Sequence, residues 1–143
     1  MDKKEEEAVA SQLLTVPLFA HLSNKQALSV ARTGALRTFA AGAHVVTKGD
    51  KGVGFFLILS GRMEVKSDGK TLATLQGGNF FGEMALFDDQ PRTADVVAVE
   101  SSRCLVLSRW EFWGALSREP ETLRALMAEL VRRLRDTPKA LSE

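Results

Sequence analysis

A chain of 143 residues with 45% apolar and 26% charged residues suits one globular domain, and this composition excludes disorder over most of its length. The 19 Lys and Arg against 18 Asp and Glu give a formal net charge of +1, so no strong global field attracts nucleic acid or an anionic membrane. A charged ligand must therefore be bound by local groups.

The start of the chain and its cysteine content bear on the compartment. Residues 1–7 are mostly charged and lack the apolar stretch of a secretory signal, and no apolar run has the length of a membrane-spanning helix. The single cysteine, Cys104, cannot form an internal disulfide or a cysteine-cluster metal site. We therefore expect a cytoplasmic protein, with Cys104 as a small core residue on a strand.

Residues 4–34 are predicted to form the N-terminal helices. A charged lead is followed by an apolar stretch over residues 13–19. Ser23 and Gln26 then form a capping box, in which each side chain accepts a hydrogen bond from the backbone N–H of the other residue. The helix that follows is expected to reach about Arg32 and to stop at Gly34.

The glycines mark a central region of strands between two helical ends. Nine of the eleven glycines lie between Gly42 and Gly82, whereas the flanking segments carry Leu, Ala, Arg and Glu in helical spacing. Turn signals separate short strands predicted at 44–47, 55–59, 62–66, 71–75, 94–98 and 103–107. Many short strands favour a closed antiparallel sandwich or barrel, here over residues 37–107, because an open sheet would expose its edges. The predicted class is α+β, mainly β with helices at both ends.

Two helices are predicted over residues 108–136. Ser108 and Glu111 form a second capping box, and Pro120 opens the last helix at a position of the first turn that tolerates proline. The two tryptophans of the chain lie on the first of these helices and are expected to pack it against its neighbours.

The last helix carries apolar residues in an a/d heptad pattern. They are Leu123, Met127, Leu130 and Leu134. This seam could pack on the strands as core, cover a bound ligand, or pair with the same helix of a second copy. The arginines at 132, 133 and 135 are interpreted as a solvated face whose charge favours the C-terminal end of the helix.

Residue types that bind phosphate gather within residues 77–94. Gly82 leads into a short helical turn, and the free backbone N–H groups at the start of such a turn bind phosphate oxygens. Arg92 follows within ten residues, and its planar fork can bind two phosphate oxygens beside the Thr93 hydroxyl. A phosphate would repel Glu83, so this carboxylate is interpreted as the acceptor for a sugar hydroxyl of the same ligand. The segment therefore predicts a compactly bound nucleotide.

Two runs in this segment, Phe81-Gly82-Glu83-Met84-Ala85-Leu86 and Pro91-Arg92-Thr93-Ala94, resemble the phosphate-binding cassette of the cyclic nucleotide-binding domain family. This family includes the catabolite activator protein, cyclic-nucleotide-dependent kinases and cyclic-nucleotide-gated channels. Its pattern is F-G-E, an apolar residue, A-L, a short gap and P-R-[TSA]-A. The resemblance extends over about residues 13–136. It implies an eight-stranded antiparallel jelly-roll β-barrel with N-terminal helices, C-terminal lid helices and a cassette at 81–94.

The resemblance also implies which residues bind the nucleotide. They are Gly82, Glu83, Met84, Ala85, Arg92, Thr93, Met127 and Leu130. Glu83 would hold the ribose 2'-hydroxyl, Arg92 would pair with the cyclic phosphate, and the backbone of the other cassette residues would line the phosphate. Thr93 could meet the amino group of a guanine. Met127 and Leu130 of the lid helix would lie nearest the base.

The function implied is a non-catalytic regulatory module for signal transduction. It would bind a 3',5'-cyclic nucleotide, cyclic AMP in preference to cyclic GMP, without a metal, and would move its last helix on binding. A homodimer through that helix is compatible with the resemblance, and we expect the effector domain, covalent or not, to lie outside this chain. Family members often carry Asp where Val53 stands, which bears on the geometry of that turn.

Other functions agree less well with the residues. A metal-dependent jelly-roll enzyme needs clustered His ligands, whereas His21 and His44 are far apart in the sequence and are expected to be structural or solvent-facing. Asp88-Asp89 is predicted to be a turn rather than an acid-base pair. A DNA-binding regulator would need a helix-turn-helix after the last helix, where the chain ends. The alternative is a degenerate jelly roll used for interaction or dimerisation, against which the intact cassette argues.

Overall fold

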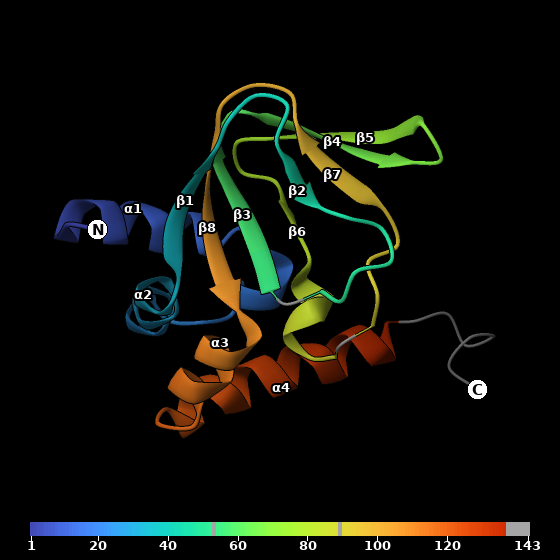
Figure 1. Ribbon diagram of the computed structural model, residues 1–143. Coiled ribbons are helices and arrows are strands. Elements are labelled where there is room, and N and C mark those ends of the chain that lie inside the picture. The colour runs from blue at the N-terminus through green and yellow to red at the C-terminus, as the bar shows by residue number, and fades with distance from the viewer. Residues whose placement is uncertain (53, 89, 137–143) are drawn as a thin grey trace.

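The computed structural model describes residues 1–52, 54–88 and 90–136, so the interpretations of Val53 and Asp89 lie outside the described residues. Figure 1 shows strands in two facing layers, with α3 and α4 across the end at which β8 finishes. The helices are α1 (Lys3–Leu13), η1 (Pro17–Phe19), α2 (Asn24–Thr33), η2 (Glu83–Leu86), α3 (Arg109–Leu116) and α4 (Pro120–Arg135). The strands are β1 (Ala35–Phe39), β2 (His44–Val46), β3 (Gly54–Ser60), β4 (Arg62–Ser67), β5 (Lys70–Gln76), β6 (Phe80–Phe81), β7 (Asp95–Ala98) and β8 (Ser102–Ser108).

The strands form two four-stranded antiparallel sheets. One has the order β1-β8-β3-β6 and the other β2-β7-β4-β5, so strands that are far apart in the sequence become neighbours. β8, for example, pairs with β1 on one side and with β3 on the other. This is the antiparallel jelly roll that the family resemblance implies, and the predicted fold class is confirmed.

The six predicted strands are all present, each within one residue of its predicted ends. Two strands were not predicted from the sequence. β1 begins at Ala35, before the expected barrel. Its residues do not alternate regularly between exposed and partly buried positions, so they lack the pattern by which a strand is recognised. β6 has only two residues, Phe80 and Phe81, and becomes a strand through its pairing with Leu57 and Phe56 of β3. Neither strand carries enough local pattern to be recognised without its partner.

Two of the N-terminal helices, α1 and α2, begin at side-chain caps, and the cap of α2 is the one that the sequence predicts. The Ser23 hydroxyl accepts from Gln26 N at 3.1 Å, and the Gln26 side chain accepts from Ser23 N at 2.9 Å, so the predicted capping box is confirmed. α2 ends at Thr33 with Gly34 as its C-cap. α1 has its own cap, because Asp2 accepts from Glu5 N at 2.7 Å.

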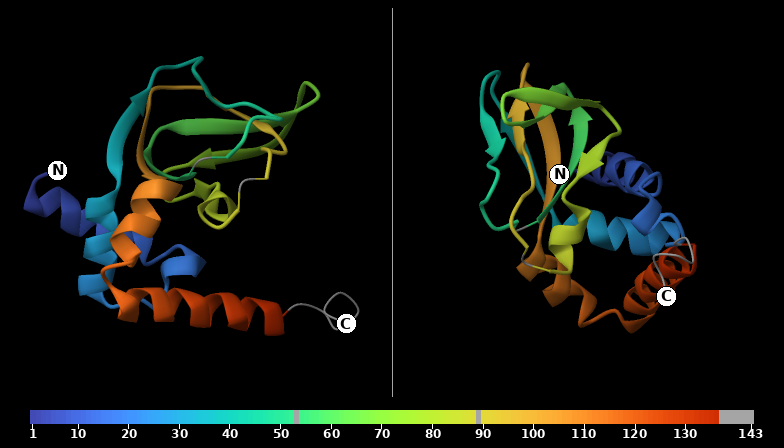
Figure 2. Two further views of the ribbon diagram at one scale, coloured as in Figure 1. Left: turned by 60° about the horizontal axis from the view of Figure 1, so that its bottom comes forward. Right: turned by 90° about the vertical axis from the view of Figure 1, so that its right-hand side faces the viewer.

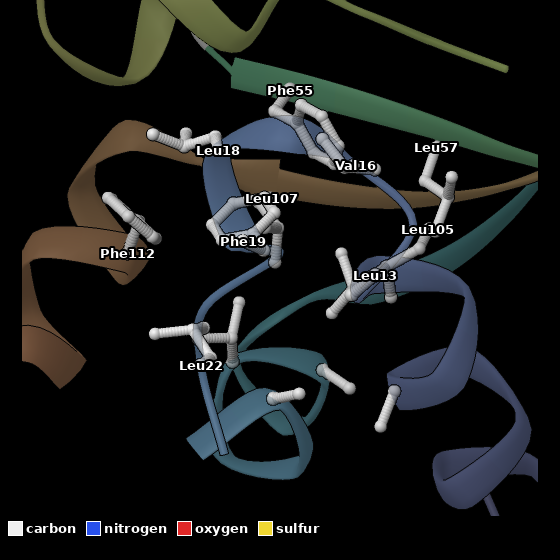
Figure 3. Packing of buried hydrophobic residues seen from close by; sticks show 14 of the residues in the cluster. Leu13, Val16, Leu18, Phe19, Leu22, Phe55, Leu57, Leu105, Leu107 and Phe112 are labelled. Carbon is white, nitrogen blue, oxygen red and sulfur yellow. The ribbon is translucent and has the colours of Figure 1, made fainter. Parts of the chain in front are cut away.

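The larger hydrophobic core joins the N-terminal segment to the sheet and to the C-terminal helices (Figure 3). Phe19 of η1 lies edge-on to Phe55 of β3, with ring centroids 5.5 Å apart, and to Phe112 of α3, with centroids 6.3 Å apart. All three rings are at most 1% exposed. A turn near the N-terminus therefore holds the sheet and α3 together through aromatic burial.

A second, smaller core lies between the two sheets. Ile58, Met63, Val96 and Ala98 pack there with Cys104, which is fully buried. Burial raises the pKa of the Cys104 thiol to about 11, so the thiol stays protonated and acts as a small apolar side chain. The prediction for Cys104 is confirmed.

The C-terminal helices depart from the sequence expectation in detail. The Ser108 hydroxyl caps α3 by accepting a hydrogen bond from Glu111 N at 3.2 Å. The Glu111 carboxylate accepts from the Ser108 hydroxyl, not from the Ser108 backbone N–H as in a capping box. Trp113 packs against Phe87 and Phe112, whereas Trp110 is 69% exposed, so the expected packing holds for only one tryptophan.

The heptad seam of α4 does not form one face. Leu123 and Leu130 pack on the large core, whereas Met127 and Leu134 are 57% and 69% exposed. The fully inward positions are Thr122, Leu126 and Glu129. Figure 2 shows α4 crossing the end of the sheets with its C-terminal half near η2. None of the described helices has the length and apolar character needed to cross a bilayer.

Candidate functional site

A pocket of about 510 Å³ opens where β6, η2 and the approach to β7 meet. This volume lies in the range of small-molecule sites. The lining residues are Gly52, Phe80, Phe81, Gly82, Glu83, Met84, Ala85, Asp88, Gln90, Pro91, Arg92 and Thr93. All six cassette residues that the sequence analysis assigns to nucleotide binding are therefore gathered around one cavity.

Arg92 is held by the main chain of its neighbours. Its backbone N–H donates to Asp50 O at 2.7 Å, and its carbonyl accepts from Gly49 N at 2.9 Å. The guanidinium Nη2 donates to Gly54 O at 2.8 Å, and the guanidinium carbon lies 5.9 Å from the centre of the Phe56 ring. The loop between β2 and β3 thus fixes the backbone of this residue, and β3 fixes its guanidinium.

Two glycines make room for the guanidinium. A Cβ atom at Gly82 would lie 2.5 Å from Arg92 Nη1, and one at Gly52 would lie 3.0 Å from Arg92 Nε. Gly82 also has a φ of +82°, which L side chains rarely adopt. The glycine of the cassette is therefore needed twice, for the turn into η2 and for the close approach of a charged side chain.

The charge of Arg92 has no carboxylate counter-charge among the described residues. Within residues 1–52, 54–88 and 90–136, no ion pair joins it to a carboxylate, and its polar partner is a carbonyl. Burial lowers the pKa of Arg92 below its ordinary value, but a guanidinium remains protonated at neutral pH. A half-buried cation in this state favours an anion in the adjoining pocket.

Glu83 opens η2 and presents its carboxylate to α4. Its Oε1 accepts a hydrogen bond from Arg133 Nη1 at 3.2 Å, whereas its Oε2 is buried without a hydrogen-bond partner among the described residues. Glu83 and Met84 are the first residues of η2, so their backbone N–H groups have no acceptor inside that turn. The Ala85 N–H donates to Gly82 O at 3.0 Å.

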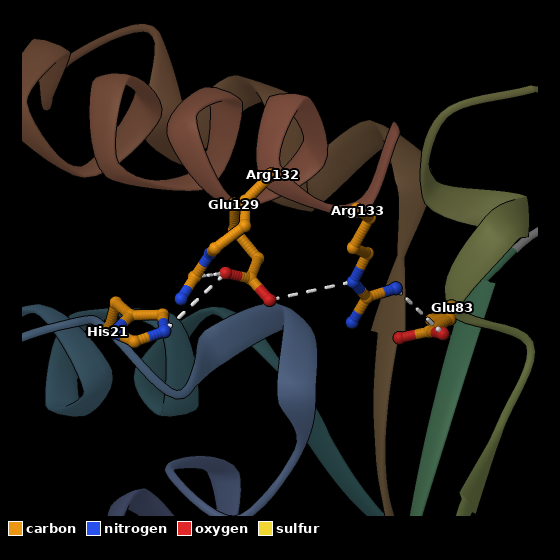
Figure 4. A network of polar contacts seen from close by, with 5 residues as sticks. All are labelled: His21, Glu83, Glu129, Arg132 and Arg133. Carbon is orange, nitrogen blue, oxygen red and sulfur yellow. Dashed lines mark hydrogen bonds and ion pairs between the residues drawn. The ribbon is translucent and has the colours of Figure 1, made fainter. Parts of the chain in front are cut away.

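Arg133 was not singled out from the sequence as a site residue. It was interpreted as part of a solvated face, but it lies between Glu83 and Glu129, with its Nε 3.6 Å from Glu129 Oε1 (Figure 4). The signal that could have revealed it is its place one helical turn after Glu129, on the face that Leu126 buries.

The remaining predicted residues differ in their positions. Met84 is 63% exposed and Ala85 is buried, and both line the pocket, as does the exposed Thr93. Met127 and Leu130 are not among the described residues that line it. Their contact with a base stays a prediction.

Aromatic side chains fix the cassette to rigid elements. Phe81 stacks on Phe56 of β3, with centroids 4.7 Å apart and planes within 5°. Trp113 of α3 donates its indole N–H to Leu86 O at 2.5 Å, and its ring meets Phe87 edge-on. The pocket wall is therefore anchored to both β3 and α3.

The double role of Gly82 can be tested by comparison with Gly78. Both have positive φ (+82° and +93°), so alanine at either position should cost about 1–2 kcal/mol of stability. A Cβ at Gly78 meets no atom within 4 Å, whereas one at Gly82 meets Arg92 and Gly54 O. In thermal unfolding, Gly82→Ala should therefore lower the Tm clearly more than Gly78→Ala. Equal shifts would show that both Arg92 and the Gly54 carbonyl move aside without cost.

Comparisons with known proteins agree with this geometry. The family model described as the cyclic nucleotide-binding domain matches residues 36–119. A Pycsar effector protein from Xanthomonas perforans is 34% identical over 116 residues, which cover 79% of this chain and 38% of that protein. The cyclic AMP receptor protein of Thermus thermophilus is 36% identical over 105 residues, which cover 70% of this chain and 49% of that protein. The chain thus spans less than half the length of both relatives.

Among solved structures, the N-terminal domain of a transcriptional regulator from Streptomyces coelicolor A3(2) is similar along nearly its whole length. The TM-score is 0.83 at 30% identity, and the match covers 91% of this chain and 94% of that one. The family model, the two relatives and this structure agree with the cassette pattern, and the chain belongs to the cyclic nucleotide-binding domain family.

Proposed function

We propose that this protein is a non-catalytic sensor that binds a 3',5'-cyclic nucleotide in the cassette pocket and converts occupancy into a movement of α4. The observation that carries the proposal is the guanidinium of Arg92, which is half-buried beside the pocket and has no carboxylate partner among the described residues. A degenerate module that had lost its ligand would have no physical need to keep such a cation.

In the proposed pose, the cyclic phosphate supplies the negative charge beside Arg92. The fork of Arg92 donates to its oxygens, and the N–H groups of Glu83 and Met84 add backbone donors at the start of η2. The ribose 2'-hydroxyl donates to Glu83 Oε2, the buried acceptor that has no partner in the described residues. These contacts recognise phosphate and sugar.

The base is recognised less directly. Thr93 is exposed at the pocket, where its hydroxyl could lie beside either adenine or guanine. We therefore rank cyclic AMP ahead of cyclic GMP because of the similarity to a protein named as a cyclic AMP receptor. Calorimetric titration with cyclic AMP, cyclic GMP, cyclic CMP, cyclic UMP and 5'-AMP tests the function and the order together. The absence of binding for all five would favour the interaction module instead.

The proposed function also implies partners for this protein. The exposed apolar side chains of α4, Met127, Val131 and Leu134, form the surface through which we propose that two copies associate. The effector that reads the movement is expected outside this chain. A lone, buried cysteine agrees with a reducing compartment, so a cytoplasmic location is part of the proposal.

Arg92→Ala should weaken cyclic AMP binding by about tenfold to a hundredfold, because a charge-assisted hydrogen bond is lost and the phosphate is left unpaired. Arg124→Ala is the matched control, since Arg124 is 79% exposed on α4 and pairs only with Glu121 in the described contacts. Calorimetry on both variants measures the difference. Affinity close to that of the wild type in a folded Arg92→Ala protein would refute the phosphate assignment.

Glu83→Gln tests the ribose contact in combination with 2'-deoxy cyclic AMP. If the 2'-hydroxyl donates to Glu83, removing either group should weaken binding, and removing both should cost little more than removing one. The four affinities complete a double cycle. Losses that add independently would show that Glu83 acts elsewhere, for example only by orienting η2.

Hydrogen exchange tests the movement of α4. A ligand shifts a conformational equilibrium only if it binds one arrangement more tightly than the other, and the contact of Arg133 with Glu83 links α4 to the site. On adding cyclic AMP, amides of both residues 82–87 and residues 123–134 should gain protection. Protection limited to the cassette would mean that α4 is a fixed part of the fold.

A further inference from the structure

A buried carboxylate lies on the inner face of α4, outside the pocket. Glu129 is 7% exposed, and it follows Leu126 on the face that packs against the domain. Its Oε2 lies 3.5 Å from His21 Nε2, it pairs with Arg132, and its Oε1 lies 3.6 Å from Arg133 Nε. Figure 4 shows these contacts as one connected network that ends at Glu83.

A carboxylate at this buried position costs free energy of folding. Removing it from water carries a large desolvation penalty, and an apolar residue of similar volume is often equally stable or more stable at such a site. Leu126 and Leu130 on either side show that the surroundings accept apolar side chains. The charge of Glu129 therefore calls for an explanation in terms of what it contacts.

Arg133 supplies that explanation. Its Nη1 is directed to Glu83 Oε1 at 3.2 Å, and its Nε faces Glu129. Two carboxylates, on η2 and on α4 itself, thus fix the plane of one guanidinium. With Oε1 engaged, the acceptor of Glu83 that has no partner among the described residues is its buried Oε2.

On the basis of the function proposed above, we propose that Glu129 is a positioning residue for the nucleotide site. It holds Arg133 in the orientation that presents Glu83 to the ribose, although it does not line the pocket. Through His21, which lies between η1 and α2, it also ties this orientation to the N-terminal segment. Nucleotide binding at Glu83 and docking of α4 on that segment are therefore coupled, and by linkage each strengthens the other.

The test uses the full chain, cyclic AMP and 2'-deoxy cyclic AMP. Glu129→Gln should weaken cyclic AMP binding by roughly fivefold or more, within the usual range for coupled sites. The loss for 2'-deoxy cyclic AMP should be smaller, because that ligand lacks the hydroxyl that Glu83 accepts. A merely structural role would weaken both ligands equally, and equal weakening would overturn the proposal.

Glu121→Gln is the matched control, because Glu121 lies on the same helix with a 77% exposed side chain and pairs with Arg124. It should leave both affinities within about twofold, as expected for an exposed pair. The route through Arg133 is tested by combining Glu129→Gln with Arg133→Gln. The double variant should bind about as weakly as Arg133→Gln alone, and additive losses would show that Glu129 does not act through Arg133.

A readout without ligand separates this inference from the proposed function. Hydrogen exchange of residues 126–133 should be faster in Glu129→Gln than in the wild type and unchanged in Glu121→Gln. If the wild type binds no cyclic AMP, the ligand assignment fails and the exchange comparison alone decides the coupling of α4. Unchanged exchange in Glu129→Gln would overturn it. Glu129→Met, which replaces the charge by an apolar side chain, serves if the Gln variant loses its cooperative thermal transition.

Discussion

The site depends on one half-buried guanidinium whose charge is not balanced by a carboxylate within the described residues. Keeping Arg92 in this state requires a backbone that approaches it closely, and Gly52 and Gly82 provide that approach. It also requires a fixed main chain, which the loop between β2 and β3 supplies through Gly49 and Asp50. The glycines that look like simple turn signals in the sequence are thus part of the electrostatics of the site.

The two halves of α4 are attached to the domain by different kinds of interaction. In the first half, Thr122 and Leu126 are each 1% exposed, so that half is held by apolar burial. The second half combines the apolar contact of Leu130 with the charges of Glu129 and Arg133, which contact His21 and Glu83. Of these contacts, the one between Arg133 and Glu83 reaches a residue that lines the pocket. The C-terminal half is therefore the part of the helix through which the proposed ligand at Glu83 would act.

The sequence predicts features that are carried by neighbouring residues and misses those that depend on distant ones. The cassette is recognisable because its residues are nearly contiguous, and the predicted strands alternate within themselves. The short strand β6 needs β3 to exist, and Arg133 needs Glu83, which lies 50 residues away in the chain. The heptad pattern placed Met127 and Leu130 on one face, whereas the domain buries the line through Leu126 and Glu129. Periodicity specifies that a helix has an apolar face, but the shape of the partner decides which residues lie at its centre.

The balance of charge around the pocket also bears on which phosphates the site accepts. Glu83 and Asp88 both line the pocket and Glu83 is paired with Arg133, whereas the guanidinium of Arg92 has no carboxylate partner among the described residues. A cyclic phosphodiester carries one negative charge and matches it. A 5'-monophosphate carries nearly two near pH 7, because its second pKa is about 6. The additional charge would lie close to Glu83 in a partly desolvated pocket, where like charges repel more strongly than in water. The same arrangement that would bind the proposed cyclic nucleotide thus disfavours its hydrolysis product, which a sensor of the cyclic form must not bind.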